Sequence, residues 1–202
     1  ESIGGCIYGE EDGKIYVNQY ISSETEIEGT KIQVRSEMPY GGRAEICVQG
    51  AAELCLRVPS WNAGITMKVN GRKTEPAVKE GYICLYCDGD IEISLDFHIK
   101  PRFVYANENV RQDGGRKAVQ YGAMVLGGDN GKQLSAVRIK SLAGAKAAVG
   151  EYFTLDVKAE RLKTSAALYS YDAPVAEPIT LRLIPYFAWA NRGRGDMRVW
   201  WL

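Results

Sequence analysis

The sequence has no surplus of charge, because 25 Lys and Arg residues balance 25 Asp and Glu residues in a chain of 202. A neutral chain has no general attraction for a phosphate backbone or an anionic membrane surface, so we expect neither as a partner. Apolar runs are also scarce, and Ala51–Leu56 is far shorter than the roughly 20 residues of a membrane-spanning helix. The remaining composition, 46% hydrophobic, is typical of a soluble globular protein.

The first residues, Glu1–Cys6, contain neither an initiator methionine nor a basic and apolar leader. We therefore expect that the chain begins after processing or inside a longer protein. No Asn-x-Ser/Thr acceptor site occurs, and the number of cysteines is odd. Both features favour a cytoplasmic location with reduced thiols. The cysteines are Cys6, Cys47, Cys55, Cys84 and Cys87.

Apolar and polar residues alternate with a period of two, most clearly in Ile91–Ile99, which predicts a half-buried strand. The same pattern recurs in Ile32–Arg35, Leu54–Val58, Ile65–Val69 and Leu181–Leu183. Short turn signals separate these runs: Asp12-Gly13, Gly41-Gly42, Asn70-Gly71, Asp88-Gly89-Asp90 and Asp129-Asn130-Gly131. Only short stretches, such as Leu142–Val149, are compatible with a helix. The pattern predicts an all-β protein, an antiparallel β-sandwich or two sandwich modules in tandem.

A domain boundary is predicted near residues 100–115, where Pro101 interrupts the best strand and a polar run follows. This run is either a linker or a long loop. We predict one β-sandwich module over residues 1–105 and, over residues 106–202, either a second module or a continuation of the first.

Cys84 and Cys87 have the C-x-x-C spacing of zinc and redox sites. Residues three apart on a strand point to opposite faces, and no second C-x-x-C or His pair supplies further ligands. We therefore expect both to be small buried hydrophobic residues.

Other catalytic patterns are incomplete. His98 is the single histidine, and it lies at a polar-facing position of its strand. No Gly-x-Ser-x-Gly motif accompanies it, and Ser60, Ser94 and Ser135 lie in strand or turn contexts. The Gly-rich pieces Gly127-Gly128 and Gly193-Arg194-Gly195 lack phosphate-loop spacing and are typical of turns.

Carboxylates are numerous, and two at the right separation would suffice for a glycosidase. Their positions in turns and on polar strand faces favour solvation instead. The acids considered are Glu10, Glu11, Glu24, Glu26, Glu28, Asp88 and Asp90. We assign no catalytic, cofactor-binding or metal-binding residue in this chain.

Aromatic residues concentrate in a few motifs and admit two interpretations. Buried, they would fill a sandwich core or an interface; exposed, they would stack on sugar rings as in a carbohydrate-binding module. We favour packing, and the residues to which we assign it are Trp61, Tyr186, Phe187, Trp189 and Trp200.

Several of these motifs resemble a known family. Leu56–Trp61, Val69–Gly71, Gly81-Tyr82 and the acidic turn Asp88–Asp90 are similar to the β-sandwich region that follows the catalytic barrel in glycoside hydrolase family 127, the β-L-arabinofuranosidases. The segments Asn109–Gly122 and Ile184–Arg192, with Met197, Val199 and Trp200, resemble later parts of the same family in the same order.

The resemblance implies a helical (α/α)6 barrel that carries a zinc-bound cysteine nucleophile, further cysteine ligands and a glutamate. None of these residues matches this chain, and Cys6 lies beyond the ligand positions. Gln120–Gly127 also departs from the family pattern at that strand.

We therefore predict a catalytically silent C-terminal β portion of a cytoplasmic glycosidase, with no cofactor of its own. Zinc is implied only for the full-length enzyme. The resemblance implies packing against its own barrel and a homodimer as partners, with a carbohydrate substrate for the parent enzyme. The alternatives are a carbohydrate-binding module or, third, a hydrolase that uses its own carboxylates.

Overall fold

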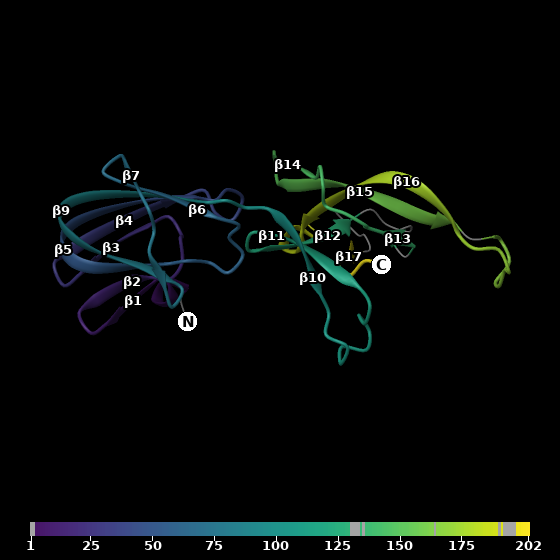
Figure 1. Ribbon diagram of the computed structural model, residues 1–202, viewed down its shortest axis with the longest axis horizontal. Helices are drawn as coiled ribbons and strands as arrows, with labels where there is room; N and C mark the ends of the chain where they lie inside the picture. Colours follow the sequence, from purple (N-terminus) through teal and green to yellow (C-terminus); the bar gives the residue numbers. More distant parts are fainter. Residues whose placement is uncertain (1–2, 130–133, 135, 164, 190, 192–196) are drawn as a thin grey trace. The chain divides into compact units, whose positions relative to one another are not determined.

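The structure is a computed structural model that describes the chain except for residues 1–2, 130–133, 135, 164, 190 and 192–196. The chain divides into two compact units, Glu1–Lys100 and Pro101–Leu202. Both units are built from strands, and helical geometry in the described residues is limited to two short 3-10 turns, η1 (Ile3–Cys6) and η3 (Tyr186–Ala188) (Figure 1). The predicted all-β fold class is confirmed, and there are two modules.

Unit 1 contains a sheet of nine strands in the described residues. Their bounds are β1 (Tyr8–Glu11), β2 (Lys14–Val17), β3 (Ser23–Ile27), β4 (Thr30–Ser36), β5 (Arg43–Arg57), β6 (Ile65–Val69), β7 (Arg72–Thr74), β8 (Val78–Lys79) and β9 (Tyr82–Phe97). The longest two, β5 and β9, are antiparallel over the whole of β5. The other edge of β5 pairs with β4 along its first part and with β2, in parallel, along its last part.

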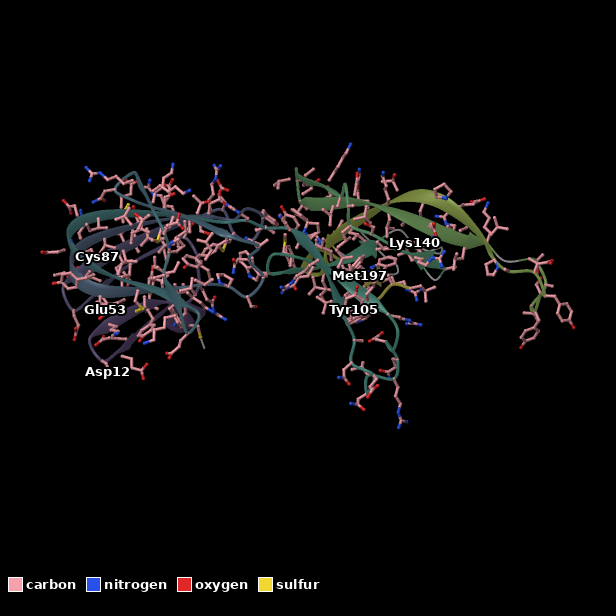
Figure 2. All side chains as sticks on the ribbon, in the orientation of Figure 1. Asp12, Glu53, Cys87, Tyr105, Lys140 and Met197 are labelled. Atoms are coloured by element: carbon pink, nitrogen blue, oxygen red, sulfur yellow. A yellow bond between two sulfur atoms is a disulfide. The ribbon has the colours of Figure 1, made fainter. Side chains whose placement is uncertain are left out.

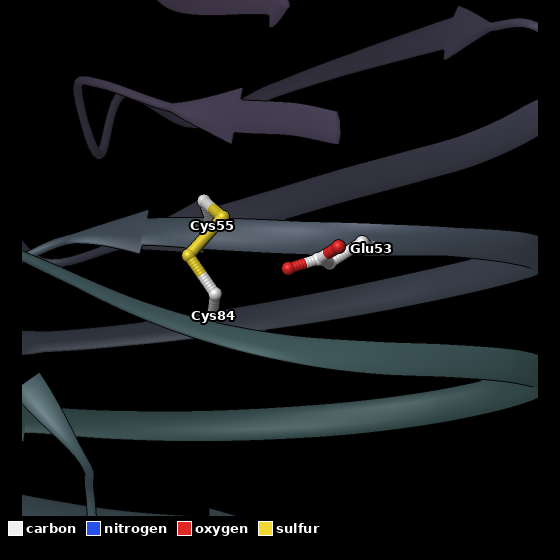
Figure 3. Close-up of side chains that lie close together, drawn as sticks. All are labelled: Glu53, Cys55 and Cys84. Atoms are coloured by element: carbon white, nitrogen blue, oxygen red, sulfur yellow. A yellow bond between two sulfur atoms is a disulfide. The ribbon is translucent and has the colours of Figure 1, made fainter. Parts of the chain in front are cut away.

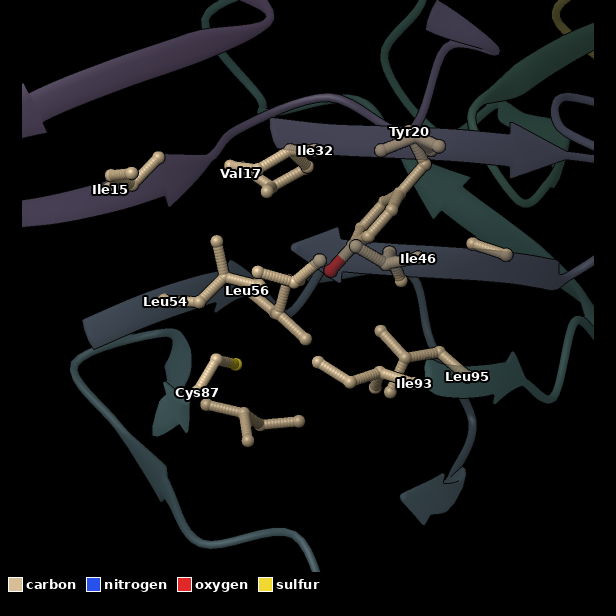
Figure 4. Packing of buried hydrophobic residues seen from close by; sticks show 14 of the residues in the cluster. Ile15, Val17, Tyr20, Ile32, Ile46, Leu54, Leu56, Cys87, Ile93 and Leu95 are labelled. Carbon is tan, nitrogen blue, oxygen red and sulfur yellow. The ribbon is translucent and has the colours of Figure 1, made fainter. Parts of the chain in front are cut away.

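The core of unit 1 follows from the period-two alternation. In β5 the even positions 44, 46, 48, 52, 54 and 56 are buried, whereas most odd positions reach solvent. Figure 4 shows Ile46, Leu54 and Leu56 of this set in one cluster with residues from β2, β4 and β9. Tyr20 belongs to the same cluster and donates its hydroxyl proton to the carbonyl of Arg57. Trp61 packs edge-on against Phe97 at 5.9 Å between ring centroids, so its predicted packing role is confirmed.

The predicted turn at Asp88-Gly89-Asp90 is wrong, because β9 continues through it. Gly89 pairs with Gly50 of β5, and both glycines have positive φ, 79° and 128°. Two facing glycines let both strands adopt unusual backbone angles at the same level while the pairing continues. In contrast, Asp12-Gly13 and Asn70-Gly71 form the predicted hairpin turns with positive φ at both residues.

Unit 2 contains eight strands in its described part. Their bounds are β10 (Pro101–Tyr105), β11 (Lys117–Tyr121), β12 (Met124–Asp129), β13 (Val137–Arg138), β14 (Lys146–Val149), β15 (Phe153–Lys163), β16 (Val175–Pro185) and β17 (Met197–Arg198). The polar run that follows Pro101 connects β10 to its antiparallel partner β11. The helix-compatible stretch Leu142–Val149 is a turn followed by β14.

Gly127 and Gly128 were expected in a turn, but both lie in β12 and pair with β16. The reason is packing, since a Cβ atom on Gly128 would lie 2.7 Å from Cη2 of Trp201. Trp201 is fully buried, and its backbone pairs with Lys117. Gly193-Arg194-Gly195 and most of Asp129-Asn130-Gly131 lie outside the described residues.

We expect Gly128→Ala to destabilise unit 2 by about 1–3 kcal/mol, because the added methyl overpacks a ring that has no exposed side to move toward. Urea unfolding followed by fluorescence measures the change. Gly150→Ala is the matched control, since nothing lies within 4 Å of its added Cβ atom. Equal losses in the two variants would contradict the close approach to Trp201.

Candidate functional site

The outer face of β2, β5 and β9 carries the chain's main cluster of reactive groups. Alternate residues of a strand share a face, so Glu53 and Cys55 both lie on this face of β5. The strand register places Lys14 of β2 beside Glu53 and Tyr16 beside Cys55. Cys84 of β9 lies directly opposite Cys55. The cluster therefore arises from strand register alone, with no loop involved.

Cys55 and Cys84 form a disulfide across this pair, with their Cα atoms 4.0 Å apart (Figure 3). The expectation of reduced thiols is wrong for these two residues, while Cys6, Cys47 and Cys87 are free. The sequence could not have indicated the pairing, because the two cysteines are 29 residues apart and only the register of β5 and β9 brings their sulfurs together.

The two cysteines of the C-x-x-C motif do point to opposite faces, as their spacing predicted. Cys84 is exposed on the outer face, so the expectation that it is buried is wrong, whereas Cys87 is buried in the core. Burial removes water from the Cys87 sulfur and raises the pKa of its thiol. Cys87 is therefore a small hydrophobic residue, as expected.

Charged and aromatic side chains surround the disulfide. The Nζ of Lys14 lies 2.9 Å from a carboxylate oxygen of Glu53, and this contact raises the pKa of Lys14. Tyr16 and Tyr82 meet edge to face with their ring centroids 5.3 Å apart, and the Tyr82 hydroxyl donates to Asn18. Figure 2 shows Glu53 and Cys87 within unit 1.

Glu53, Cys55 and Cys84 are also the one group of three potential metal ligands found among the described residues, with ligand atoms within 4.8 Å of one another. The two sulfurs are bonded to each other, which leaves no thiolate to bind a metal. These residues do not fit the cysteine-rich zinc centre that the family resemblance implies.

Unit 2 presents a different kind of surface, an apolar groove of about 630 Å³. Val104 of β10, Val125 of β12 and residues near the C-terminus line it. Apart from the amide of Gln120, the lining is aliphatic or aromatic. The lining residues are Val104, Ala118, Val119, Gln120, Val125, Tyr186, Met197, Val199 and Trp200.

Two of the C-terminal aromatic residues, Tyr186 and Trp200, line this groove. Tyr186 and Phe187 are each 57% exposed and Trp189 is 41% exposed, so these three do not fill the core, and their packing at an interface stays a prediction. Trp200 is half-buried and lines the groove, while its neighbour Trp201 is the indole that fills the core. The sequence favours packing for both Trp200 and Trp201, and the structure gives the buried position to Trp201.

The remaining candidates are not gathered into a site. His98 is exposed, and its Nε2 lies 3.0 Å from the hydroxyl of Thr66. Ser94 lies on β9, and Ser135 is outside the described residues. All seven carboxylates considered from the sequence are exposed, in agreement with solvation.

Comparison with known proteins agrees with the division into units. A model of the family "Beta-L-arabinofuranosidase, GH127 middle domain" matches residues 14–97, and one of the "Glycoside hydrolase family 127 C-terminal domain" matches residues 101–202. A non-reducing end β-L-arabinofuranosidase from Bifidobacterium longum subsp. longum is 35% identical over 98% of this chain, which covers 34% of that protein.

Solved structures show the same arrangement of strands. The crystal structure of a GH127 β-L-arabinofuranosidase from Geobacillus stearothermophilus T6 matches with a TM-score of 0.87 and 29% identity, over 98% of this chain and 35% of that one. A GH127 β-arabinofuranosidase at 24% identity and TM-score 0.80 shares the fold over 96% of this chain and 36% of its own.

These matches define the chain as a pair of β modules of the glycoside hydrolase type. The chain belongs to glycoside hydrolase family 127, with its middle domain in unit 1 and its C-terminal domain in unit 2. It spans about a third of the length of the relatives it matches. No helix in the described part has the length and hydropathy to cross a membrane.

We expect iodoacetamide at neutral pH to modify Cys6 and Cys47 in the folded chain and to spare Cys87, which has no exposed surface and a raised pKa. Peptide mapping by mass spectrometry measures the three rates. Labelling of Cys87 as fast as Cys47 would contradict its burial.

Proposed function

We propose that this chain is the non-catalytic β portion of a longer β-L-arabinofuranosidase. The observation that carries the proposal is coverage, since the chain matches the family's middle and C-terminal domains and only 34% of the Bifidobacterium relative. The zinc and the catalytic residues that the family resemblance implies would then belong to the part of the enzyme that this chain does not span.

The chain alone should not turn over an aryl β-L-arabinofuranoside, because under this proposal the catalytic residues belong to the part of the enzyme that the chain does not span. A chromogenic assay with enzyme at high concentration measures this. Turnover that disappears when a single carboxylate is changed to its amide would contradict the proposal and favour an autonomous hydrolase.

The apolar groove of unit 2 supports a docking role for the module. Val125 is 43% exposed and Val104 is 38% exposed, on the same face as Tyr186 and Met197. Contiguous apolar surface of this kind costs free energy in water and marks interaction sites. The occupant that we propose is the catalytic portion of the same enzyme, because about two thirds of the relatives' length has no counterpart in this chain.

Val125→Asp tests this docking. In the longer enzyme the new carboxylate would be buried without a partner, which costs more than the roughly 1–3 kcal/mol of an unpaired neutral polar group, and we expect a lower Tm and lower activity. In this chain alone Val125 already faces water, so we expect a small change in Tm. Thermal unfolding of both proteins measures the difference.

The matched control is Val149→Asp, which places the same change on β14 at a residue that is 63% exposed and outside the groove. It should be nearly neutral in both proteins. Equal effects of the two substitutions in the longer enzyme would contradict docking at the groove. If this chain alone forms a dimer that Val125→Asp dissociates, the occupant is a second copy instead.

Exposure of Tyr186, Phe187 and Trp189 supports a second candidate, a carbohydrate-binding module. Because Trp200 lines the groove beside Tyr186, a sugar bound there would change the indole fluorescence. We expect a flat titration with arabinose-containing oligosaccharides under the docking proposal. A saturable change that Tyr186→Ala abolishes would favour sugar binding.

The cytoplasmic location also stays a proposal. It rests on the absence of Asn-x-Ser/Thr sites and on the free thiols of Cys6, Cys47 and Cys87. Because cytoplasmic reductants keep most thiols reduced, a protein in this location would also be exposed to agents that can reduce the Cys55–Cys84 disulfide.

A further inference from the structure

The Cys55–Cys84 disulfide is one of several links between its two strands. β5 and β9 are paired at every residue from Arg43 to Arg57, so the backbone ladder continues on both sides of the disulfide. The buried side chains of Leu54, Leu56 and Ile83, on the opposite face, pack without it. Breaking the S–S bond would therefore leave the sheet folded.

The two sulfur-bearing residues differ in their access to solvent. Cys84 is exposed, whereas Cys55 has no exposed surface. Thiol–disulfide exchange begins when a thiolate attacks one sulfur and the other leaves. An external thiolate can approach Cys84 from solvent, which makes Cys55 the leaving group.

Charges on the same face affect both steps. A carboxylate oxygen of Glu53 lies within 4.8 Å of both sulfurs and repels an anionic attacking thiol. The ammonium of Lys14, 2.9 Å from Glu53, offsets this repulsion. Arg57 lies two residues beyond Cys55 on the same face and adds positive charge near the thiolate that leaves.

We propose that Cys84 is a site of reversible S-thiolation by a low-molecular-weight thiol of the glutathione class. The thiolate forms a bond to the Cys84 sulfur, the Cys55–Cys84 bond breaks, and its electron pair departs on Cys55 as a thiolate. A second thiolate then attacks the external sulfur of the mixed disulfide. This step releases Cys84 as a thiolate and oxidises the two external thiols to their own disulfide.

The experiment uses the oxidised chain with Cys6→Ser and Cys47→Ser, which removes the exposed free thiols. Reduced glutathione is added at neutral pH, the reaction is quenched with acid, and the adduct is mapped by mass spectrometry. We expect a single glutathione adduct on Cys84 at early times and two free thiols later. Far-UV circular dichroism should keep its strand signal throughout.

Single-cysteine variants in the same background separate the two sulfurs. Cys55→Ser should accept one glutathione on Cys84 from glutathione disulfide and keep it, because no neighbouring thiol remains to release it. Cys84→Ser should leave the buried Cys55 unmodified. Cys87→Ala is the control and should behave as the parent in the exchange, since Cys87 lies on the other face and alanine adds no polar group to the core.

Glu53→Gln tests the electrostatic part. Removal of the carboxylate leaves Lys14 unpaired, so we expect exchange with anionic glutathione to become about two- to fivefold faster. Exchange with a neutral thiol such as 2-mercaptoethanol should change less. Equal acceleration with both thiols would overturn this role of Glu53.

Three results would overturn the site itself: no adduct under conditions that reduce an unfolded peptide disulfide, an adduct mainly on Cys55, or loss of the strand signal on reduction. None of them bears on the docking proposal, which concerns unit 2. Conversely, failure of the groove test leaves the exchange at Cys84 unaffected.

Discussion

The antiparallel ladder between β5 and β9 is the interaction on which unit 1 depends. Fifteen residues of β5 pair with fifteen of β9, and β2, β4, β6 and β8 each pair with one or the other. A ladder of this length fixes the register, since a slip by one residue would move every buried side chain to the solvent face. The core of unit 1 and its outer face are therefore determined together.

The same register explains how one strand serves two purposes. Leu54 and Leu56 face the core of unit 1, while Glu53 and Cys55, which alternate with them along β5, belong to the outer cluster. The facing pair Gly50 and Gly89 carries positive φ angles and still keeps the two halves of the ladder in one register. The alternating run Ile91–Ile99 lies on one side of the glycine pair and Cys84 lies on the other. Cys84 therefore lies opposite Cys55 only because the register continues past the glycines.

Much of the fold could be predicted from alternation and turn chemistry. Ile65–Val69 is a strand with the bounds that its pattern gave, and Asp12-Gly13 and Asn70-Gly71 are turns because their residues tolerate positive φ. The same chemistry was misleading at Gly89 and at Gly127-Gly128. Gly89 allows a positive φ inside a strand, and Gly128 leaves room for the ring of Trp201. Both roles depend on a partner that is distant in sequence.

The surfaces could not be predicted, because they are made by pairing between distant segments. The groove joins Val104 and Val125 to residues near the C-terminus, and the disulfide joins two strands whose alternation says nothing of their partners. Burial also assigns adjacent residues different roles, since Trp201 stabilises the core of unit 2 while Trp200 faces the groove.

The two units differ in how much of their apolar surface they bury, and this difference bears on function. In unit 1 the strands that pair with β5 and β9 bring their apolar side chains into one cluster, and the outer face is left to Lys14, Glu53 and tyrosines. In unit 2 the face of β10 and β12 exposes valines beside Tyr186. Apolar area left in water lowers stability unless another surface covers it. Docking of this face, as proposed, would remove that apolar area from water and so stabilise unit 2.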